Sequence, residues 1–262
     1  MKRTWISTIA VFLFAATFAS ASDVTFTASP AAPGLTWNDA SSYATSATLS
    51  AGSATPVTTA SSATRTKTCR ALEVGGDGRI ESVEVSYAAA SNAAVAGRSY
   101  VVTPQQVTYA GGGSPSEAEV EFVRGDNAQF GRFRALERIF DGRTVSIGAS
   151  FAPKKQDADE LFEFPGGRVN SVALTLRSVL NGVATFDISM SVESDAKEKK
   201  SKKAAAGGMS MTLDGTLTLS VATSRPMSFD VSGPISVNVK KANGVRAASG
   251  SGTLSIHTDY DF

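Results

Sequence analysis

The chain has 262 residues, 42% of them hydrophobic, so it is long and apolar enough to bury a core as one large or two small domains. Its 25 Lys and Arg balance 24 Asp and Glu, so charge gives no general reason to expect nucleic acid or an anionic membrane as partner. The single cysteine, Cys69, excludes an intramolecular disulfide, and we expect a small buried residue on a strand.

Residues 1–21 have the pattern of a secretory signal peptide. Lys2 and Arg3 precede an apolar run over residues 6–18, and a small-x-small cleavage pattern ends at Ala21. The apolar run is too short to span a membrane comfortably, and no later segment is long and apolar enough for a transmembrane helix. We therefore predict export to the periplasm or the cell exterior.

Residues 22–64 are rich in Ser, Thr and Ala, and Asp23 and Asp39 are their only charged residues. Large apolar residues are scarce in this stretch. The composition therefore predicts a low-complexity N-terminal arm, mostly extended and outside the packed core.

The next segments, 65–74 and 80–87, are strand candidates. Between them, residues 75–78 read Gly-Gly-Asp-Gly and accept positive φ angles, which predicts a β-hairpin. Shorter strands are expected at 99–103, 107–110 and 119–123.

One amphipathic helix is predicted, with Asp126 as its N-cap and Asp141-Gly142 at its end. Apolar residues recur at spacings of three and four along it, at Phe130, Phe133, Leu136 and Phe140. A second, short helical turn is expected over 157–164.

The last hundred residues contain five segments of period two, at 169–179, 183–192, 209–221, 227–239 and 252–262. Asn181-Gly182 is a hairpin signal, and short connections predict an antiparallel meander. A lysine-rich insert over 197–208 is expected to be a disordered loop between strands.

Together these elements predict a mainly β fold of the α+β kind over residues 65–262. An apolar sheet face must be covered, so we expect a curved antiparallel sheet, a half-barrel or sandwich, covered by the one amphipathic helix. A division into two subdomains, 65–125 and 126–262, stays open.

The sequence contains no recognisable catalytic constellation, so we expect no enzyme activity and no cofactor. The only histidine, His257, lies on a predicted strand, and no serine has the strand-turn-helix setting of a nucleophile elbow. The acidic residues Asp157, Asp159 and Glu160 are candidates for calcium. Their spacing does not match a calcium loop, and an acidic helix start is the favoured interpretation, so no metal site is predicted.

Two segments are candidates for binding. Phe130, Phe133 and Phe140 are expected to line or plug any apolar cavity between helix and sheet. The insert's lysines could instead contact an anionic surface such as phospholipid, although a solvated loop is the default. These lysines are Lys197, Lys199, Lys200, Lys202 and Lys203.

The C-terminal segment allows two interpretations. Apolar and aromatic residues alternate up to Phe262, at Leu254, Ile256 and Tyr260. This pattern resembles the closing strand of bacterial outer-membrane β-barrels, and the resemblance implies a membrane barrel with a C-terminal insertion signal. The internal helix and the absence of aromatic girdles favour a soluble sheet whose final strand buries Phe262 at its edge.

The favoured hypothesis is an exported, bacterial-type, non-enzymatic binding or structural protein with an apolar ligand cavity. Its partner would be a lipid, a glycan or another component of the cell envelope, and not a nucleic acid. Two alternatives stay open: the outer-membrane barrel, and a hydrolase built on the carboxylates of Asp157 and Glu160.

Overall fold

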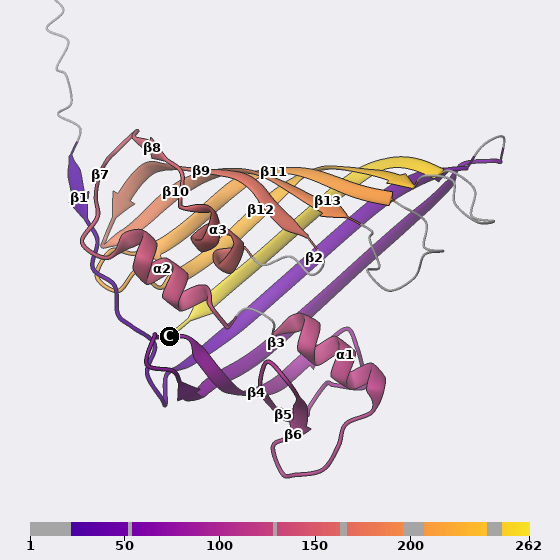
Figure 1. The fold of residues 1–262 in the computed structure, drawn as a ribbon, viewed down its shortest axis with the longest axis horizontal. Coiled ribbons are helices and arrows are strands. Elements are labelled where there is room, and N and C mark those ends of the chain that lie inside the picture. Colours follow the sequence, from indigo (N-terminus) through magenta and orange to yellow (C-terminus); the bar gives the residue numbers. More distant parts are fainter. Residues whose placement is uncertain (1–21, 52–53, 128–129, 163–166, 196–206, 240–247) are drawn as a thin grey trace, which may run out of the picture.

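Eleven antiparallel strands form one broad, curved sheet, and three short helices lie on its concave side (Figure 1). The computed structural model describes residues 22–51, 54–127, 130–162, 167–195, 207–239 and 248–262. The helices are α1 (Glu117–Asp126), α2 (Arg132–Phe140) and α3 (Lys155–Leu161).

The strands are β1 (Asp23–Thr25), β2 (Thr36–Ser50), β3 (Val57–Val74), β4 (Ile80–Ala90), β5 (Ser99–Val102), β6 (Val107–Tyr109), β7 (Thr144–Ser146), β8 (Ser150–Phe151), β9 (Arg168–Leu180), β10 (Val183–Asp195), β11 (Gly207–Ser220), β12 (Pro226–Val239) and β13 (Ala248–Asp261). Helices α1 and α2 lie between β6 and β7 in the chain, and α3 lies between β8 and β9. The large sheet has the order β6-β5-β4-β3-β2-β13-β12-β11-β10-β9-β8, and β1 pairs with β7. The predicted fold class is therefore confirmed, with three helices instead of one.

The C-terminal meander has the predicted local signals. Strands β9 to β13 pair antiparallel in chain order. Asn181 and Gly182 join β9 to β10 with φ angles of 52° and 77°, as a tight hairpin turn requires. The predicted hairpin around residues 75–78 is also confirmed as the β3–β4 connection.

The prediction of an N-terminal arm outside the core is wrong for most of residues 22–64. Strand β2 lies in the middle of the sheet, between β3 and β13, and the first half of β3 pairs with it. Small Ser, Thr and Ala side chains alternate along both strands, and β-branched Thr suits a pleated strand. Composition alone did not predict these strands, because they bury few large side chains.

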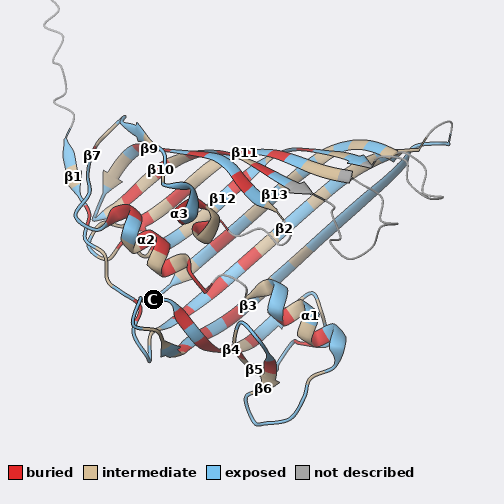
Figure 2. Ribbon diagram, in the orientation of Figure 1, coloured by how far each residue is buried: buried red, intermediate tan, exposed pale blue. Residues whose placement is uncertain are grey.

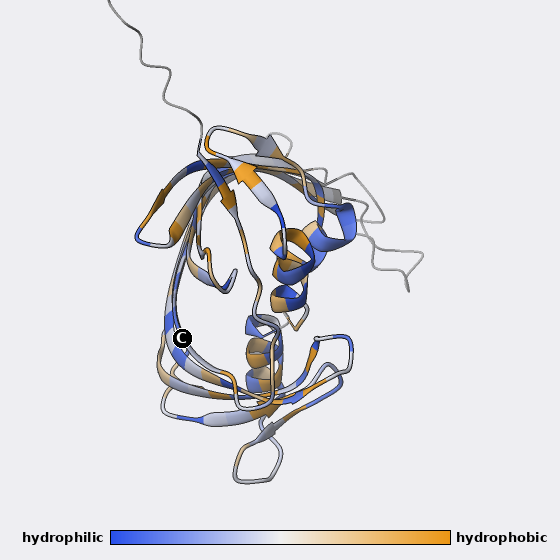
Figure 3. Ribbon diagram, turned by 90° about the vertical axis from the view of Figure 1, so that its left-hand side faces the viewer, coloured by the Kyte–Doolittle hydropathy of each residue, from blue (hydrophilic) through white to orange (hydrophobic). Residues whose placement is uncertain are grey.

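A diagonal row of glycines accommodates the curvature of the sheet. Gly215, Gly233 and Gly252 lie on neighbouring strands, and the register moves by two residues from each glycine to the next. A Cβ built on Gly233 would overlap the carbonyl oxygen of Thr212, and the other two glycines have equivalent overlaps. The backbones approach closely because these residues have no side chain. In Figure 3 the sheet therefore appears as a C that wraps around the helices.

Helix α1 replaces the strand predicted at 119–123. Ser116 accepts a hydrogen bond from the Glu119 backbone N–H, and the Glu119 carboxylate accepts bonds from the Ser116 N–H at 3.0 Å and hydroxyl at 2.7 Å. This capping box starts the helix and overrides the alternating pattern. The hydroxyls of Tyr100 and Tyr109 also donate to Glu119, which ties α1 to β5 and β6.

Helix α2 confirms the predicted aromatic helix, but it starts at Arg132 and its N-cap is Gly131. The prediction that Asp126 caps it is wrong, because Asp126 ends α1 and its side chain is paired with Lys67. Helix α3 overlaps the short helical turn expected over 157–164, but it starts at Lys155 and ends at Leu161, and residues 163 and 164 lie outside the described residues.

Two hydrophobic clusters lie under this one continuous sheet. The larger includes Phe140, Phe186 and Leu213, next to α2 and α3, and the smaller includes Tyr87 and Phe133. Figure 2 shows that buried positions gather on the strands where helices cover them, whereas the far end of β3 is exposed. The core is therefore concentrated at one end of long strands.

Strand β13 does not close the sheet at an edge. It lies between β2 and β12, and the edge strands β6 and β8 are not paired with each other, so the sheet is open. An open sheet does not match the alternative of a closed outer-membrane barrel. Phe262 is 43% exposed, so the prediction of a buried C-terminal phenylalanine is also wrong.

Within the described residues, no helix is long and apolar enough to cross a membrane.

The glycine row gives a first prediction. Gly233→Ala should lower the free energy of unfolding by about 2 kcal/mol or more, because the new Cβ meets backbone atoms that cannot move without shifting β11. Gly76→Ala is the matched control, since nothing lies within 4 Å of its Cβ position. Urea unfolding measures both variants, and equal midpoints would contradict the role of the row.

The Glu119 carboxylate gives a second prediction. Hydrogen bonds from the Ser116 hydroxyl and backbone N–H lower its pKa to about 2, from an ordinary 4.5. Its stabilising contribution is therefore fully present above about pH 4.5 and is lost as the pH falls towards 2. The urea midpoint of Glu119→Gln should lie below that of the unchanged chain at neutral pH, and the difference should close by about pH 2. A difference that does not vary with pH would argue against this explanation.

Candidate functional site

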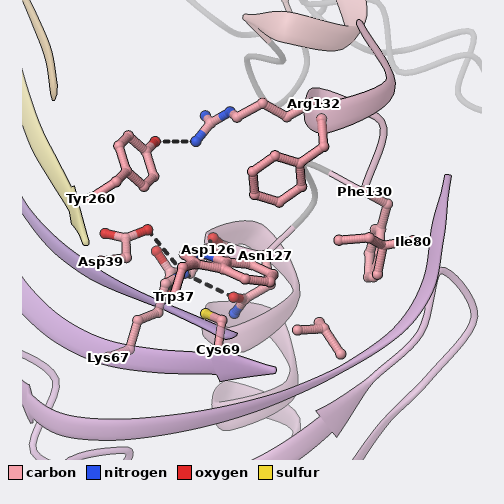
Figure 4. A pocket seen from close by; sticks show the side chains of 12 residues that line it. Trp37, Asp39, Lys67, Cys69, Ile80, Asp126, Asn127, Phe130, Arg132 and Tyr260 are labelled. Atoms are coloured by element: carbon pink, nitrogen blue, oxygen red, sulfur yellow. Dashed lines mark hydrogen bonds and ion pairs between the residues drawn. The ribbon is translucent and has the colours of Figure 1, made fainter. Parts of the chain in front are cut away.

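A group of charged side chains is buried between the sheet and the end of α1 (Figure 4). The Lys67 ammonium donates to the Asp126 carboxylate and to the Asn127 side-chain oxygen, both at 2.8 Å, and to the Asp126 backbone oxygen at 3.2 Å. Asp39 lies 3.7 Å from the same ammonium, and Arg65 forms an ion pair with Asp126. We call these five residues, together with Tyr87, the buried ion cluster.

The strand register brings these residues together. Asp39 pairs with Lys67 across β2 and β3, so their side chains lie on the same face. Helix α1 ends above this face and supplies Asp126 and Asn127. From β4, the Tyr87 hydroxyl donates to Asp126 at 2.7 Å and accepts from Asn127 at 2.9 Å.

The charges within the buried ion cluster stabilise one another. Burial alone would raise the pKa of Asp126, but Lys67 and Arg65 outweigh it and the pKa is lowered. Burial alone would lower the pKa of Lys67, but Asp126 and Asp39 outweigh it and the pKa is raised. The charged forms of Asp126 and Lys67 are therefore favoured. A cluster in which two cations face two carboxylates is suited to hold α1 on the sheet, not to transfer protons.

A small cavity of about 50 Å³ lies beside this cluster, and Figure 4 shows the side chains around it. Phe130 and Phe133 form one wall, and Cys69 and Tyr260 lie on the strand side. Burial raises the pKa of Cys69 to about 11, so the buried thiol is unreactive, as expected for a structural cysteine. The space suits a few waters, whereas pockets for organic ligands measure about 300 Å³ or more.

The three predicted cavity phenylalanines do not share one site. Phe130 and Phe133 border the small cavity, and Phe133 packs edge-on against Trp37 at 5.1 Å. Phe140 is fully buried in the larger core, where its ring lies 5.3 Å from Phe186. In this arrangement all three side chains fill space between helix and sheet.

The acidic residues considered for calcium, and for hydrolysis, join α2 to α3. The Arg138 guanidinium donates to Asp157 at 2.6 Å and to Glu160 at 2.8 Å. Asp159 pairs with Lys155 at 3.3 Å and accepts from the Val169 backbone N–H. Among the described residues no group of His, Cys, Asp and Glu has an arrangement that could hold a metal ion. These carboxylates thus form ion pairs with the side chains of Arg138 and Lys155.

Two other sequence candidates lie elsewhere. Lys197, Lys199, Lys200, Lys202 and Lys203 lie outside the described residues. His257 is on the outer face of β13, between Asp230 and Asp259 at 3.1 and 3.0 Å, with no serine among its hydrogen-bond partners.

An exposed apolar surface of the described sheet was not predicted from the sequence. Beyond the helices, inward-facing residues of β2, β3, β12 and β13 leave an apolar surface partly open. Tyr43 pairs with Ile256, and Leu49 pairs with Val57, so these side chains share the face of the buried ion cluster. We call this surface the open concave patch; it consists of Tyr43, Ala47, Leu49, Val57, Val237, Leu254 and Ile256.

A hollow of about 670 Å³ crosses the same four strands at the level of Leu254. Its lining includes Thr45, Ser61 and Gly233, and every other lining residue is also uncharged. Four of the seven residues of the open concave patch lie within residues 22–64, so the prediction of an arm outside the core left this surface unpredicted. The spacing of Tyr43, Ala47 and Leu49, all on one face of an extended strand, could have predicted this surface.

No family model and no curated protein matches this chain. Among solved structures, a LolA superfamily protein from Nitrosomonas europaea is similar over 86% of this chain and 84% of that chain, at 9% sequence identity and a TM-score of 0.18. So low a TM-score carries no argument about the function of this chain.

The buried ion cluster gives a third prediction. Lys67→Met should lower the free energy of unfolding by about 3 kcal/mol or more, because Asp126 and Asp39 lose a buried counter-charge. The control is Arg177→Met, which breaks an exposed pair with Asp187 and should cost about 1 kcal/mol or less. Urea unfolding at neutral pH compares them, and similar losses for the two variants would show that the cluster does not hold α1.

Proposed function

We propose that this protein is an exported, non-enzymatic binding protein whose open concave patch holds the acyl chain of a lipid of the cell envelope. The observation that carries the proposal is the exposure of large apolar side chains on a face continuous with the core. Tyr43, Leu49 and Val57 are 40%, 37% and 59% exposed. Leu254 and Ile256 are half-buried beside them and contact the larger core. Contiguous exposed apolar surface is typical of interaction sites.

The shape of this surface supports an elongated ligand. Gly252 lies opposite Ala47, and Gly250 lies opposite Leu49, so bare backbone forms part of the patch between larger side chains. From Tyr43 to Leu49 the strand runs about 20 Å, enough for an extended hydrocarbon chain. The patch carries no charged side chain, which favours a hydrocarbon over a sugar, whose hydroxyls need several polar partners.

Two further features support the other parts of the proposal. The signal-peptide pattern of residues 1–21 supports export, which would place the patch among envelope lipids. The pairing of Asp157 and Glu160 with Arg138 supports a binding role over hydrolysis, because both carboxylates already form an ion pair.

A neutral fluorescent probe tests the proposal. N-phenyl-1-naphthylamine should bind the purified chain, and a neutral monoacylglycerol below its micelle concentration should displace it. Leu254→Asp and Ile256→Asp should weaken probe binding about tenfold or more, because each places a charge in the apolar patch.

The matched controls are Ser249→Asp and Ser251→Asp, whose side chains lie on the opposite face of β13. They should leave probe binding unchanged, and thermal melting of all four variants checks that each is folded. Absence of displaceable binding would refute the proposal. Loss of binding only in the two controls would put the ligand on the other face of the sheet and refute it as well.

A further inference from the structure

Arg225 is a partly buried cation without a counter-charge in the described chain. It lies in the turn between β11 and β12, and its guanidinium stacks on the ring of Phe262 at 5.1 Å. Its Nε atom is buried and has no hydrogen-bond partner. Among the described residues no ion pair involves Arg225.

A second arginine without an ion pair in the described chain lies near it. Arg132, the first residue of α2, donates to the Tyr260 hydroxyl and lies over the Tyr260 ring at 5.5 Å. Tyr260 and Phe262 are two residues apart on β13, and Phe262 packs edge-on against Phe133 at 5.8 Å. Two guanidinium groups therefore flank one aromatic cluster at this end of the sheet.

Several other buried or partly buried cations in the described chain, unlike Arg225 and Arg132, have carboxylate partners. Lys67 and Arg65 pair with Asp126, and Arg138 pairs with Asp157 and Glu160. The Nε atom of Arg65 also has no hydrogen bond, but it forms the ion pair with Asp126. Arg225 differs because no carboxylate among the described residues offsets the cost of removing its charge from water, and burial lowers its pKa.

We propose that Arg225, assisted by Arg132, binds an oxyanion from outside the chain, the phosphate or carboxylate of a small molecule or of a lipid head group. The guanidinium group offers its donors in a planar fork that fits two oxygens of such an anion. The ring of Phe262 covers one side of the Arg225 guanidinium and shields it partly from water, which strengthens the attraction. The anion would supply the charge that Arg225 lacks.

This site is independent of the proposed acyl-chain site. Arg225 lies beyond the end of β13 that carries Phe262, whereas the open concave patch lies around Leu254 and Ile256. Neither guanidinium belongs to the patch. Either proposal can therefore fail while the other stands, and the tests use different probes.

Calorimetric titration of the purified chain with inorganic phosphate at low ionic strength tests the oxyanion site. Phosphate should bind, and Arg225→Gln should weaken binding about tenfold or more, with a smaller loss for Arg132→Gln. The matched control is Arg143→Gln. Arg143 also stacks on a phenylalanine, Phe151, at 4.5 Å and has no ion pair in the described chain, but its Nε donates to the Ile139 backbone oxygen.

Thermal melting provides the second measurement. Without phosphate, Arg225→Gln should melt at the same temperature or higher, because it removes an uncompensated charge. Phosphate should raise the melting temperature of the unchanged chain and of Arg143→Gln, but not that of Arg225→Gln. No phosphate binding, binding unaffected by Arg225→Gln, or a lower melting temperature of this variant without phosphate would each overturn the proposal.

Hexyl phosphate distinguishes the two sources of the anion. Tighter binding of hexyl phosphate than of inorganic phosphate, by about tenfold or more, would support a lipid head group, because the alkyl chain would contact the aromatic cluster. Equal affinities would support a free phosphate. In either case, Arg225→Gln must weaken the binding for the oxyanion site to stand.

Discussion

The pairing of β2 with β13 is the contact on which the rest of the structure depends. It runs without a bulge from Ser50–Ser249 to Asn38–Asp261 and joins the N-terminal strands to the C-terminal meander. Without it, β2 to β6 would form one sheet and β8 to β13 another, with β7 paired to β1 alone. The buried ion cluster lies along one part of this junction, and the open concave patch lies along another. Both features therefore combine residues from distant parts of the sequence.

The two parts of the junction differ in what covers them. Near α1, paired charges such as Lys67 and Asp126 occupy the concave face and fix a helix there. Farther along β2 the same face carries Tyr43 and Leu49, and helices no longer cover it. Long strands thus allow one end of the sheet to hold the core while the other presents a surface. The glycine row gives both ends a common curvature.

Short sequence patterns predicted the turns and strands whose geometry depends mainly on residues close together in the chain. The Asn181-Gly182 turn and the alternating strands of the meander specify their own geometry, so the C-terminal hundred residues were predicted well. The strands at 36–50 and 57–64 were missed because small polar residues form a strand only when neighbours pair with them. Asp126 was misassigned because its side chain serves a partner 59 residues away, Lys67. The buried ion cluster was not predicted for the same reason, since the register of β2 against β3 brings its residues together.

The central position of β13 has a consequence for the order of folding. Strand β2 cannot gain its second neighbour until residues 248–261 have been synthesised, about 200 residues after β2 itself. Closing so long a loop is slow, and the incomplete sheet would meanwhile expose two unpaired strand edges. A chain that folds late remains unfolded for longer after synthesis, and an unfolded chain is what a secretory channel that threads extended polypeptide accepts. The late pairing of β13 would therefore suit the export that we propose for this chain.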